Sequence, residues 1–388
     1  MNQENDAFPQ TGPSVVVISH GFQTHYESGF VTGLADNGAK VLLVGSDETD
    51  RAHLPSSVRI VNLRGSQDPK RSRFRKAANL LGYHCRLLAL VVRHRSAIVH
   101  TIGLLTPLFL VGVLENLLFR LIARRLVVTV HNILPHDQHT WLNRKLARIA
   151  YRVPSTLMVH TVETKRRLVE QFGVPASNVV VIQHGLNVHF TGTEVTRTEA
   201  RSMLGLGSAE TVVLFFGVWA PYKGLDVLVR AFSDMDDTWR LMIVGVPSNP
   251  EYRETILALV EASPRKGAIS VVDRFVRDDE IPTYFMAADL CAMPYRHIDQ
   301  SGVVFTAFIF GTPLLVTDVG DFRSYVNERV GLIVPRATER CVSDGLRLFQ
   351  STSANYDRDS IRHGSRKYQW QSTVLPLFPV YQGFNPTS

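Results

Sequence analysis

A chain of 388 residues is too long for one ordinary hydrophobic core, so we expect two domains. Its 45% hydrophobic and 20% charged residues are ordinary for a globular protein, which argues against a disordered or fibrous chain. The formal charge of +7 is concentrated in residues 1–190, whereas the remainder is slightly acidic.

The basic first half could meet nucleic acid, an anionic membrane surface or an acidic substrate. Nucleic acid is the least favoured, because no recognised module accompanies the charge. Residues 70–76 (KRSRFRK) are dense enough to attract anionic lipid headgroups, although solvated helix faces would explain many of the basic residues. Three widely separated cysteines give no disulfide framework, which fits a reducing cytoplasm. No signal pattern or membrane-spanning segment is expected, and residues 1–13 are predicted to be a disordered tail.

The first half alternates apolar runs with helical stretches. Strands are predicted at residues 14–19, 40–44, 58–63, 98–101, 126–131, 156–160 and 179–182. This alternation predicts a doubly wound parallel sheet, and hence a Rossmann-like domain over residues 14–190. Residues 20–29 are expected to form a polar loop, which lacks the G-x-G-x-x-G fingerprint. Residues 102–125 mix leucines and phenylalanines with arginines, and they fit either a core helix or a patch that docks on a membrane.

The second half repeats the pattern after a small, polar connection at residues 190–210. Strands are predicted at residues 211–216, 240–244, 268–272, 289–293, 314–317 and 330–334. A second Rossmann-like domain is therefore expected over residues 191–366.

The stretch at residues 288–320 is predicted to run as strand, loop, helix, strand and loop. A helix whose first turn is Ser301, Gly302 and Val303 presents unpaired backbone N–H groups and a partial positive charge. Gly302 has no side chain, so a phosphate can approach this backbone closely. Ligands of open α/β sheets bind beyond the carboxyl ends of the strands. The stretch thus indicates a diphosphate ligand, with an ordinary strand–helix unit capped by Ser301 as the alternative.

Two further residues are candidates for the same chemistry. Lys223 stands where a loop becomes a helix, so its ammonium could reach a diphosphate. His131 follows a strand and is followed by His136, Asp137 and His139. A metal site is an alternative there, but the spacing matches no closed zinc pattern, and histidines that order a loop are the plainer alternative.

Several motifs at consistent spacing resemble the family 4 glycosyltransferases of the GT-B architecture. Residues 300–303 (QSGV) resemble a branch that carries Gln-Ser-Gly-Val in place of the first glutamate of a Glu-x7-Glu pair. The other matching segments are residues 215–217 (FFG), 221–226 (PYKGLD), 273–276 (DRFV) and 279–282 (DEIP). The resemblance covers most of residues 211–335. It implies two Rossmann-like doubly wound domains that face each other across a cleft, with residues 367–388 crossing back to the N-terminal, acceptor-side domain.

The resemblance also implies an activity. A sugar would pass from a nucleotide-diphosphate sugar to a lipid-linked or oligosaccharide hydroxyl acceptor, with retention of configuration, in the biosynthesis of a surface polysaccharide or glycolipid. No metal or other cofactor is expected, and the protein would be cytoplasmic and peripheral at the inner face of the membrane. The residues implied are His131 and Lys223 for catalysis; Gly217, Phe275, Val276, Gln300, Ser301, Gly302, Val303 and Thr306 for donor binding; and Ser28, Gly29 and His184 in a loop over the cleft.

The chain departs from the family pattern at three points. Thr306 replaces the second glutamate, Ala220 stands where an arginine is common, and residues 321–323 (DFR) replace a glycine and Pro-Glu. Arg323 is a candidate for the missing positive charge. A GT-B protein that binds a nucleotide or a partner without turnover is therefore the alternative function, and a nicotinamide oxidoreductase is a distant third because the glycine fingerprint is missing.

Overall fold

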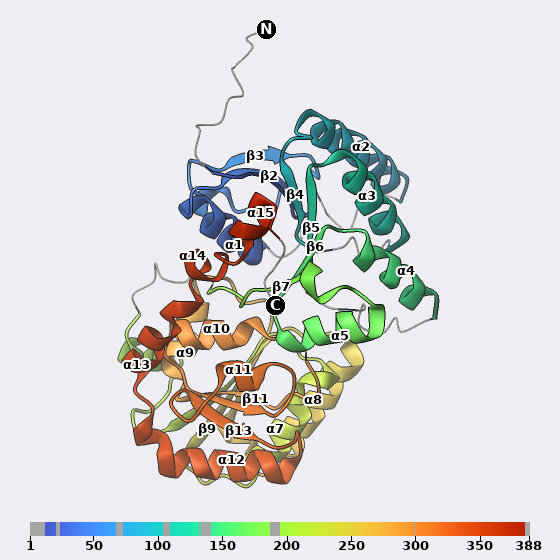
Figure 1. The fold of residues 1–388 in the computed structure, drawn as a ribbon. Coiled ribbons are helices and arrows are strands. Elements are labelled where there is room, and N and C mark those ends of the chain that lie inside the picture. Colours follow the sequence, from blue (N-terminus) through green and yellow to red (C-terminus); the bar gives the residue numbers. More distant parts are fainter. Residues whose placement is uncertain are drawn as a thin grey trace. The chain divides into compact units, whose positions relative to one another are not determined.

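The computed structural model describes residues 12–20, 24–66, 73–103, 109–131, 133, 141–186, 195–298 and 300–384, with the side chains of residues 73–77, 109, 142 and 143 left undescribed. The chain divides into two compact units. Unit 1 comprises Met1–Gly185 and Tyr368–Ser388, and unit 2 comprises Leu186–Lys367. Each unit is a Rossmann-like α/β domain built on one parallel sheet (Figure 1).

Unit 1 has a seven-stranded parallel sheet in the order β3-β2-β1-β4-β5-β6-β7. Its strands are β1 (Ser14–Ile18), β2 (Lys40–Gly45), β3 (Arg59–Asn62), β4 (Ile98–Thr101), β5 (Arg125–Val130), β6 (Thr156–Val159) and β7 (Val179–Val181). Most of these strands are apolar on both faces, because helices cover both sides of the sheet. In β1, for example, Val16 and Ile18 enter one core whereas Val15 and Val17 enter the other.

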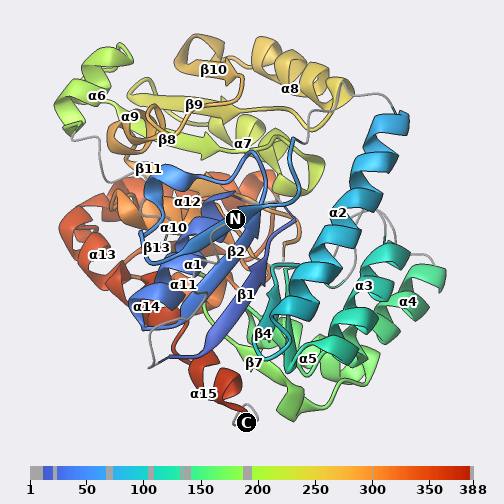
Figure 2. The same ribbon diagram turned by 90° about the horizontal axis from the view of Figure 1, so that it is seen from above.

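The helices of unit 1 form two layers. Helices α2 (Arg73–Arg93), α3 (Phe109–Ile122), α4 (Trp141–Arg152) and α5 (Val162–Phe172) contribute to the first core. Helices α1 (Thr24–Asp36), α14 (Trp370–Thr373) and α15 (Leu377–Gln382) contribute to the second core, so the C-terminal segment is built into unit 1. Figure 2 shows α2, α3 and α4 beside one another. Among the described helices, none combines the length and the hydrophobicity that a membrane span requires.

The predicted loop at residues 20–29 is wrong in its second half. Helix α1 begins at Thr24, so Ser28 and Gly29 are helical residues. The polar residues of this segment suggested a loop, but Tyr26, Phe30, Val31 and Leu34 provide a buried helical face. The start of the loop at residues 21–23 and the basic run at residues 70–72 lie outside the described residues.

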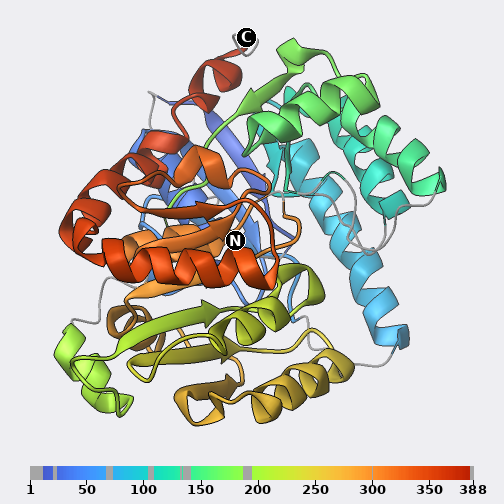
Figure 3. The ribbon, with the colours of Figure 1, turned by 90° about the horizontal axis from the view of Figure 1, so that it is seen from below.

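Unit 2 has a six-stranded parallel sheet in the order β10-β9-β8-β11-β12-β13. Its strands are β8 (Thr211–Phe216), β9 (Trp239–Gly245), β10 (Ile269–Asp273), β11 (Leu290–Met293), β12 (Leu314–Thr317) and β13 (Gly331–Val334). Its helices include α6 (Arg197–Met203), α7 (Leu225–Phe232), α8 (Pro250–Ala262), α9 (Ile281–Ala287), α10 (Gly302–Ile309), α11 (Phe322–Tyr325), α12 (Glu339–Thr352) and α13 (Arg358–Gly364). Figure 3 shows α12 beside α7 on one face of this sheet.

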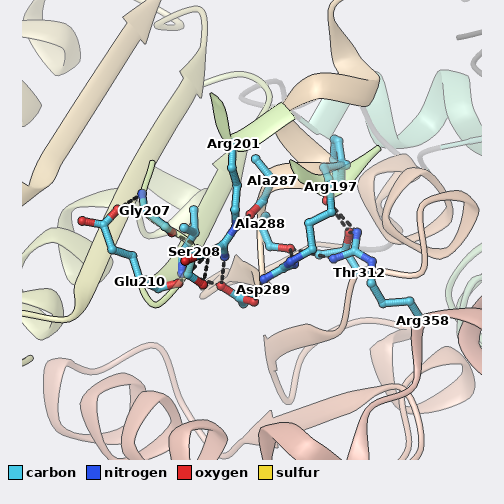
Figure 4. A network of polar contacts seen from close by, with 12 residues as sticks. Arg197, Arg201, Gly207, Ser208, Glu210, Ala287, Ala288, Asp289, Thr312 and Arg358 are labelled. Atoms are coloured by element: carbon cyan, nitrogen blue, oxygen red, sulfur yellow. Dashed lines mark hydrogen bonds and ion pairs between the residues drawn. The ribbon is translucent and has the colours of Figure 1, made fainter. Parts of the chain in front are cut away.

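A network of arginines closes the amino-terminal edge of this sheet. Asp289, which directly precedes β11, accepts hydrogen bonds from Arg201 Nη2 at 2.5 Å and from the Val212 N–H at 2.8 Å (Figure 4). Arg358 donates to the carbonyls of Phe285, Ala288 and Phe310. Because Ala288 and Asp289 lead directly into β11 and Phe310 shortly precedes β12, the network stabilises the edge of the sheet opposite the one where ligands are expected.

Candidate functional site

The order of the strands in unit 2 changes direction between β8 and β11, and this is where doubly wound sheets bind ligands. Residues 217–224 follow β8, and residues 294–298, 300 and 301 follow β11, so the two loops lie side by side at the carboxyl edge. The Arg296 N–H donates to the Tyr222 carbonyl at 2.7 Å, and the Arg296 guanidinium bonds both carboxylate oxygens of Asp226 at 2.9 and 2.7 Å. These bonds fix the two loops against each other.

Glycine allows the two loops to approach this closely. Gly224 has a φ of 64°, in the left-handed region, and a Cβ on it would lie 2.0 Å from the carbonyl oxygen of Pro294. Any side chain at this position would therefore push the loops apart. The motif PYKGLD thus places Lys223 rigidly, one residue before this contact.

Lys223 is a buried cation beside the start of α10. It is 8% exposed, and its Nζ lies 5.5 Å from the centroid of the Tyr295 ring. Among the described residues, no carboxylate pairs with it. Burial lowers the pKa of Lys223 to about 8, because water no longer solvates the ammonium. A diphosphate placed here would supply the counter-charge that the described residues of unit 2 do not provide.

Four of the predicted donor-binding residues come together around this lysine. A Cβ on Gly217 would lie 3.4 Å from Lys223 Nζ and 3.8 Å from a methyl group of Val303. Val303 stands in the first turn of α10, next to Gly302 and to the buried N-cap residue Ser301. The loop after β8 and the N-terminus of α10 therefore face the same point.

The N-terminus of α10 is open toward a ligand. A Cβ on Gly302 would meet no described heavy atom within 4 Å. The side chain of Ser301 makes no capping hydrogen bond. The Val304 N–H donates to the Ser301 carbonyl at 3.3 Å, whereas the N–H groups of Gly302 and Val303 have no acceptor inside the helix. Gln300 Nε2 is buried without a partner among the described residues. These donors and the helix dipole favour an anion at this position.

The remaining residues predicted for the donor are spread more widely. Thr306 lies one turn into α10, and its hydroxyl donates to the Gly302 carbonyl at 3.4 Å. Phe275 and Val276 follow the edge strand β10; Phe275 is 72% exposed, whereas Val276 is buried. The contact of these residues with a nucleotide stays a prediction.

The departures from the family pattern have visible structural consequences. Arg323, proposed as a replacement cation, pairs with Asp318 of its own loop at 2.5 Å, so its charge is already neutralised. Ala220 is 5% exposed and follows Trp219, which is fully buried. Lys223 is therefore the cation that this site offers among the described residues of the two loops, apart from Arg296, which is paired with Asp226.

Unit 1 places a different cluster at the carboxyl ends of its strands. His131 follows β5, His160 follows β6 and His184 lies beyond β7. Their rings surround Tyr26 of α1, with ring centroids 4.7, 5.4 and 5.3 Å from the Tyr26 centroid. Trp370 of the C-terminal segment completes the cluster, 4.9 Å from Tyr26. His131 and His184 were predicted from the sequence as site residues, whereas Tyr26, His160 and Trp370 were not. His160 nevertheless ends a predicted strand in the same manner as His131.

The three histidines are neutral at neutral pH. Burial lowers the pKa of His131 to about 3 and that of His184 to about 4, and it lowers the pKa of His160 well below its usual range. His160 Nδ1 donates to the Ile182 carbonyl at 3.1 Å, so its Nε2 accepts from the Tyr26 hydroxyl at 3.0 Å. His131 Nε2 is buried and has no hydrogen-bond partner among the described residues, which leaves a polar atom available to a ligand.

Ser28 and Gly29 take part in helix packing next to this cluster. The Ser28 hydroxyl donates to the Thr24 carbonyl at 3.1 Å. A Cβ on Gly29 would lie 2.2 Å from Nε1 of Trp370, so the glycine makes room for the indole. The predicted loop conformation is wrong, because both are residues of α1, and their place over the cleft stays a prediction.

Within the described residues, no group of three His, Cys, Asp or Glu side chains is arranged to hold a metal ion. His136, Asp137 and His139, which were weighed as a metal site, lie outside the described residues.

The chain matches two family models. The model described as Glycosyltransferase Family 4 matches residues 28–190, and the model described as Glycosyl transferases group 1 matches residues 210–350. Together the two models account for most of the chain, one in each unit.

Curated relatives and solved structures agree with these matches. The D-inositol 3-phosphate glycosyltransferases of Kineococcus radiotolerans and Nocardia farcinica are 25% and 31% identical over 58% of this chain. The matches cover 56% and 52% of those proteins, so the chain spans about half the length of the curated relatives it matches. Sucrose-phosphate synthase from Thermosynechococcus elongatus has a TM-score of 0.74 at 17% identity, covering 95% of this chain and 98% of that one. Anabaena HepE, solved in complex with UDP and glucose, has a TM-score of 0.71 at 16% identity, covering 92% and 95%.

Proposed function

We propose, since the chain belongs to the family 4 glycosyltransferases and has the GT-B fold, that it transfers a sugar from a nucleotide-diphosphate sugar to a hydroxyl acceptor with retention of configuration. The observation that supports this best is Lys223, a buried cation that pairs with no carboxylate of the described residues, beside the N-terminus of α10. Sugar transfer requires stabilisation of the charge that develops on the departing diphosphate. Preorganised donors in a water-poor site do this most effectively.

The roles proposed for individual residues follow from their surroundings. Lys223 and the N–H groups of Gly302 and Val303 would bind the diphosphate, and the departing phosphate would take the proton of the acceptor hydroxyl. The family resemblance assigns His131 to the donor sugar and phosphate. A neutral imidazole whose buried Nε2 has no partner within the described ranges suits this role, because it can hydrogen-bond a sugar hydroxyl without adding a charge.

The proposed substrates are a nucleotide-sugar donor and a hydroxyl acceptor. The fold neighbour HepE is described with UDP-glucose, which makes UDP-hexoses the first donors to test. The acceptor would be a lipid-linked sugar or an oligosaccharide in surface polysaccharide or glycolipid biosynthesis. The protein would act at the inner face of the cell membrane, through the basic surface of unit 1, without a metal.

Transfer can be measured directly. The protein is incubated with UDP-, GDP- and ADP-sugars and either a bacterial lipid extract or D-inositol 3-phosphate, and release of nucleoside diphosphate is followed. We expect release of nucleoside diphosphate with donors of one base only, and none with the Lys223→Met variant. The proton NMR spectrum should show an α-linked product from an α-linked donor. An inverted product would refute retention.

A second candidate function is nucleotide binding without turnover. It is favoured by Ala220, which stands where the family often has an arginine, and by the pairing of Arg323 with Asp318. In that case a nucleotide would stabilise the protein, and no donor would be consumed with any acceptor.

A further inference from the structure

Helix α3 has two apolar faces, and one of them is exposed. Its inner face places Val113 and Phe119 in the core of unit 1. Its outer face bears leucines at relative positions 0, 4, 7, 8 and 11, the spacing of a single helical stripe. These residues are 38–83% exposed: Leu110, Leu114, Leu117, Leu118 and Leu121. A continuous leucine stripe of this length is more than the isolated exposed leucines that a protein surface normally has.

The neighbouring helix α4 presents a cationic face with the same spacing. Its inner face contributes Ala147, Ala150 and Tyr151 to the same core. Its exposed residues are Trp141, Arg144, Lys145, Arg148, Ile149 and Arg152. Helix α4 contains no acidic residue, and the one acidic residue of α3, Glu115, is buried against His20 and His84 at 3.1 and 3.0 Å.

The two outer faces point to the same side of unit 1. Helices α2, α3 and α4 pack on one side of the sheet, and their inner residues share one core. Their outer faces therefore all point away from the sheet on that same side. Helix α2 extends the surface with Leu81 and Val92, which are 70% and 52% exposed, and with the exposed Arg86 and Arg93. We call this combined face the α3–α4 surface.

We propose that the α3–α4 surface docks this chain on an anionic lipid bilayer. The proposal rests on the proposed function in one respect, because a lipid-linked acceptor gives the docking its purpose. Apolar side chains inserted at the level of the headgroups, with lysines and arginines beside them, are the signature of a helix that lies in a membrane interface. Helix α3 is about 21 Å long, so it lies along the interface and does not span the bilayer.

Charge complementarity favours a bilayer over a protein partner. Interfaces between proteins are depleted in lysine at their centres, whereas here Lys145 and three arginines stand directly beside the leucine stripe, without exposed acidic residues on either helix. Trp141 is 69% exposed, with Lys145 Nζ 4.1 Å from its ring centroid. An amphipathic ring with an adjacent cation is well suited to the headgroup region.

Vesicle sedimentation of the full chain tests the proposal. The vesicles contain phosphatidylcholine alone or with 30% phosphatidylglycerol. We expect the protein to bind the anionic vesicles at least ten-fold more tightly, and the binding to weaken as salt is raised. Leu118→Gln/Leu121→Gln should weaken binding at least ten-fold at every salt concentration, and Arg144→Glu/Lys145→Glu should also remove the preference for anionic lipid.

Two readouts separate docking from misfolding and from the activity. The matched control on unit 2 is Leu348→Gln/Arg340→Glu, two exposed positions of α12, which should bind vesicles like the wild type. Trp141 is the exposed member of four tryptophans, since Trp219, Trp239 and Trp370 are at most 4% exposed. Anionic vesicles should therefore shift the fluorescence to the blue in the wild type but not in Trp141→Phe.

The outcomes distinguish this proposal from the proposed function. Equal binding by the wild type and the leucine variant, or no binding to anionic vesicles, would overturn docking. A change of oligomeric state in the leucine variant, with vesicle binding intact, would identify a protein interface and overturn it as well. If vesicle binding behaves as expected but no nucleotide stabilises the protein, docking stands and the transferase proposal fails.

Discussion

Both units collect polar side chains at the carboxyl ends of neighbouring parallel strands, but the two clusters differ in charge. Unit 2 offers Lys223 and the N-terminus of α10, a site that is positive and has no anionic partner in the part of the chain that the structure describes. Unit 1 offers three histidines, buried at His160 and half-buried at His131 and His184, whose lowered pKa values keep them neutral. The same fold can thus present a site for a charged group and a site for neutral hydroxyls. Burial lowers the pKa in both, but Lys223, at about 8, stays charged at neutral pH, whereas the histidines do not.

The largest expected effect is on the free energy of unfolding, when Trp370 is removed from the histidine cluster. Trp370 is 4% exposed and packs against Gly29, Gly33 and Gly185. Trp370→Ala would leave a cavity that these glycines cannot fill, so the free energy of unfolding should fall by about 3–5 kcal/mol. Urea unfolding measures this, with the exposed Leu375→Ala as the control from the same segment. A loss below about 1 kcal/mol would show that the indole does not hold the cluster together.

Removal of the buried cation Lys223 should stabilise unit 2. Burial lowers the pKa of Lys223 to about 8, compared with about 10.4 in an unfolded chain, so its charge costs the folded state about 3 kcal/mol at pH 7. Lys223→Met should therefore raise the free energy of unfolding by up to that amount while it abolishes nucleotide binding. The unfolded state binds the proton more tightly, so the wild type should gain stability from pH 8 to pH 10, and the variant should lack this gain. Lys266→Met is the exposed control, and a destabilised Lys223→Met would contradict the account.

Acid should reveal the neutrality of the histidine cluster. His131 has a folded pKa of about 3, against about 6.5 when unfolded, so the unfolded state takes up the proton first as the pH falls. This histidine alone should cost the wild type about 2 kcal/mol of stability between pH 7.5 and pH 5. His131→Gln should lose about 2 kcal/mol less over the same interval in urea unfolding. The exposed His363→Gln should behave like the wild type, and an unchanged pH dependence in the His131 variant would mean that this imidazole is already solvated.

The smallest expected change in stability is at the helix N-terminus of unit 2. A Cβ on Gly302 would meet no described atom, so Gly302→Ala should change the free energy of unfolding by less than about 0.5 kcal/mol. The same methyl group would stand where a phosphate approaches the backbone, and nucleotide affinity measured by calorimetry should fall about ten-fold. Unchanged affinity would mean that the diphosphate does not contact this turn.

The regular elements could largely be predicted from the sequence. The strands at residues 98–101, 211–216 and 314–317 match the structure to the residue, because buried parallel strands are nearly continuous apolar runs. The candidate residues of the site in unit 2 could also be proposed from the sequence, since PYKGLD and QSGV are local motifs that follow predicted strands. The ion pair of Arg296 with Asp226, which joins the two loops, was not predicted. A contact between residues 70 positions apart leaves no local pattern in the sequence.

The unit 1 cluster was less predictable for a physical reason. Residues 20–29 were predicted to be a loop because they are mostly polar, although Tyr26 already belongs to the buried face of α1. The packing of Trp370 against glycines more than 180 residues away depends on tertiary contacts that no periodicity records. Residues 102–125 fitted either a core helix or an exposed patch, and α3 proves to have one face of each kind.

The most direct test of the central claim is thermal unfolding of the wild type and Lys223→Met with UDP, GDP and ADP. A nucleotide at a hundred times its Kd adds about 2.7 kcal/mol of stability, which is easily measured. The account predicts a shift with one base in the wild type and none in the variant. Stabilisation that survives in Lys223→Met, or its absence with every nucleotide in the wild type, would contradict the claim that this lysine marks a diphosphate site.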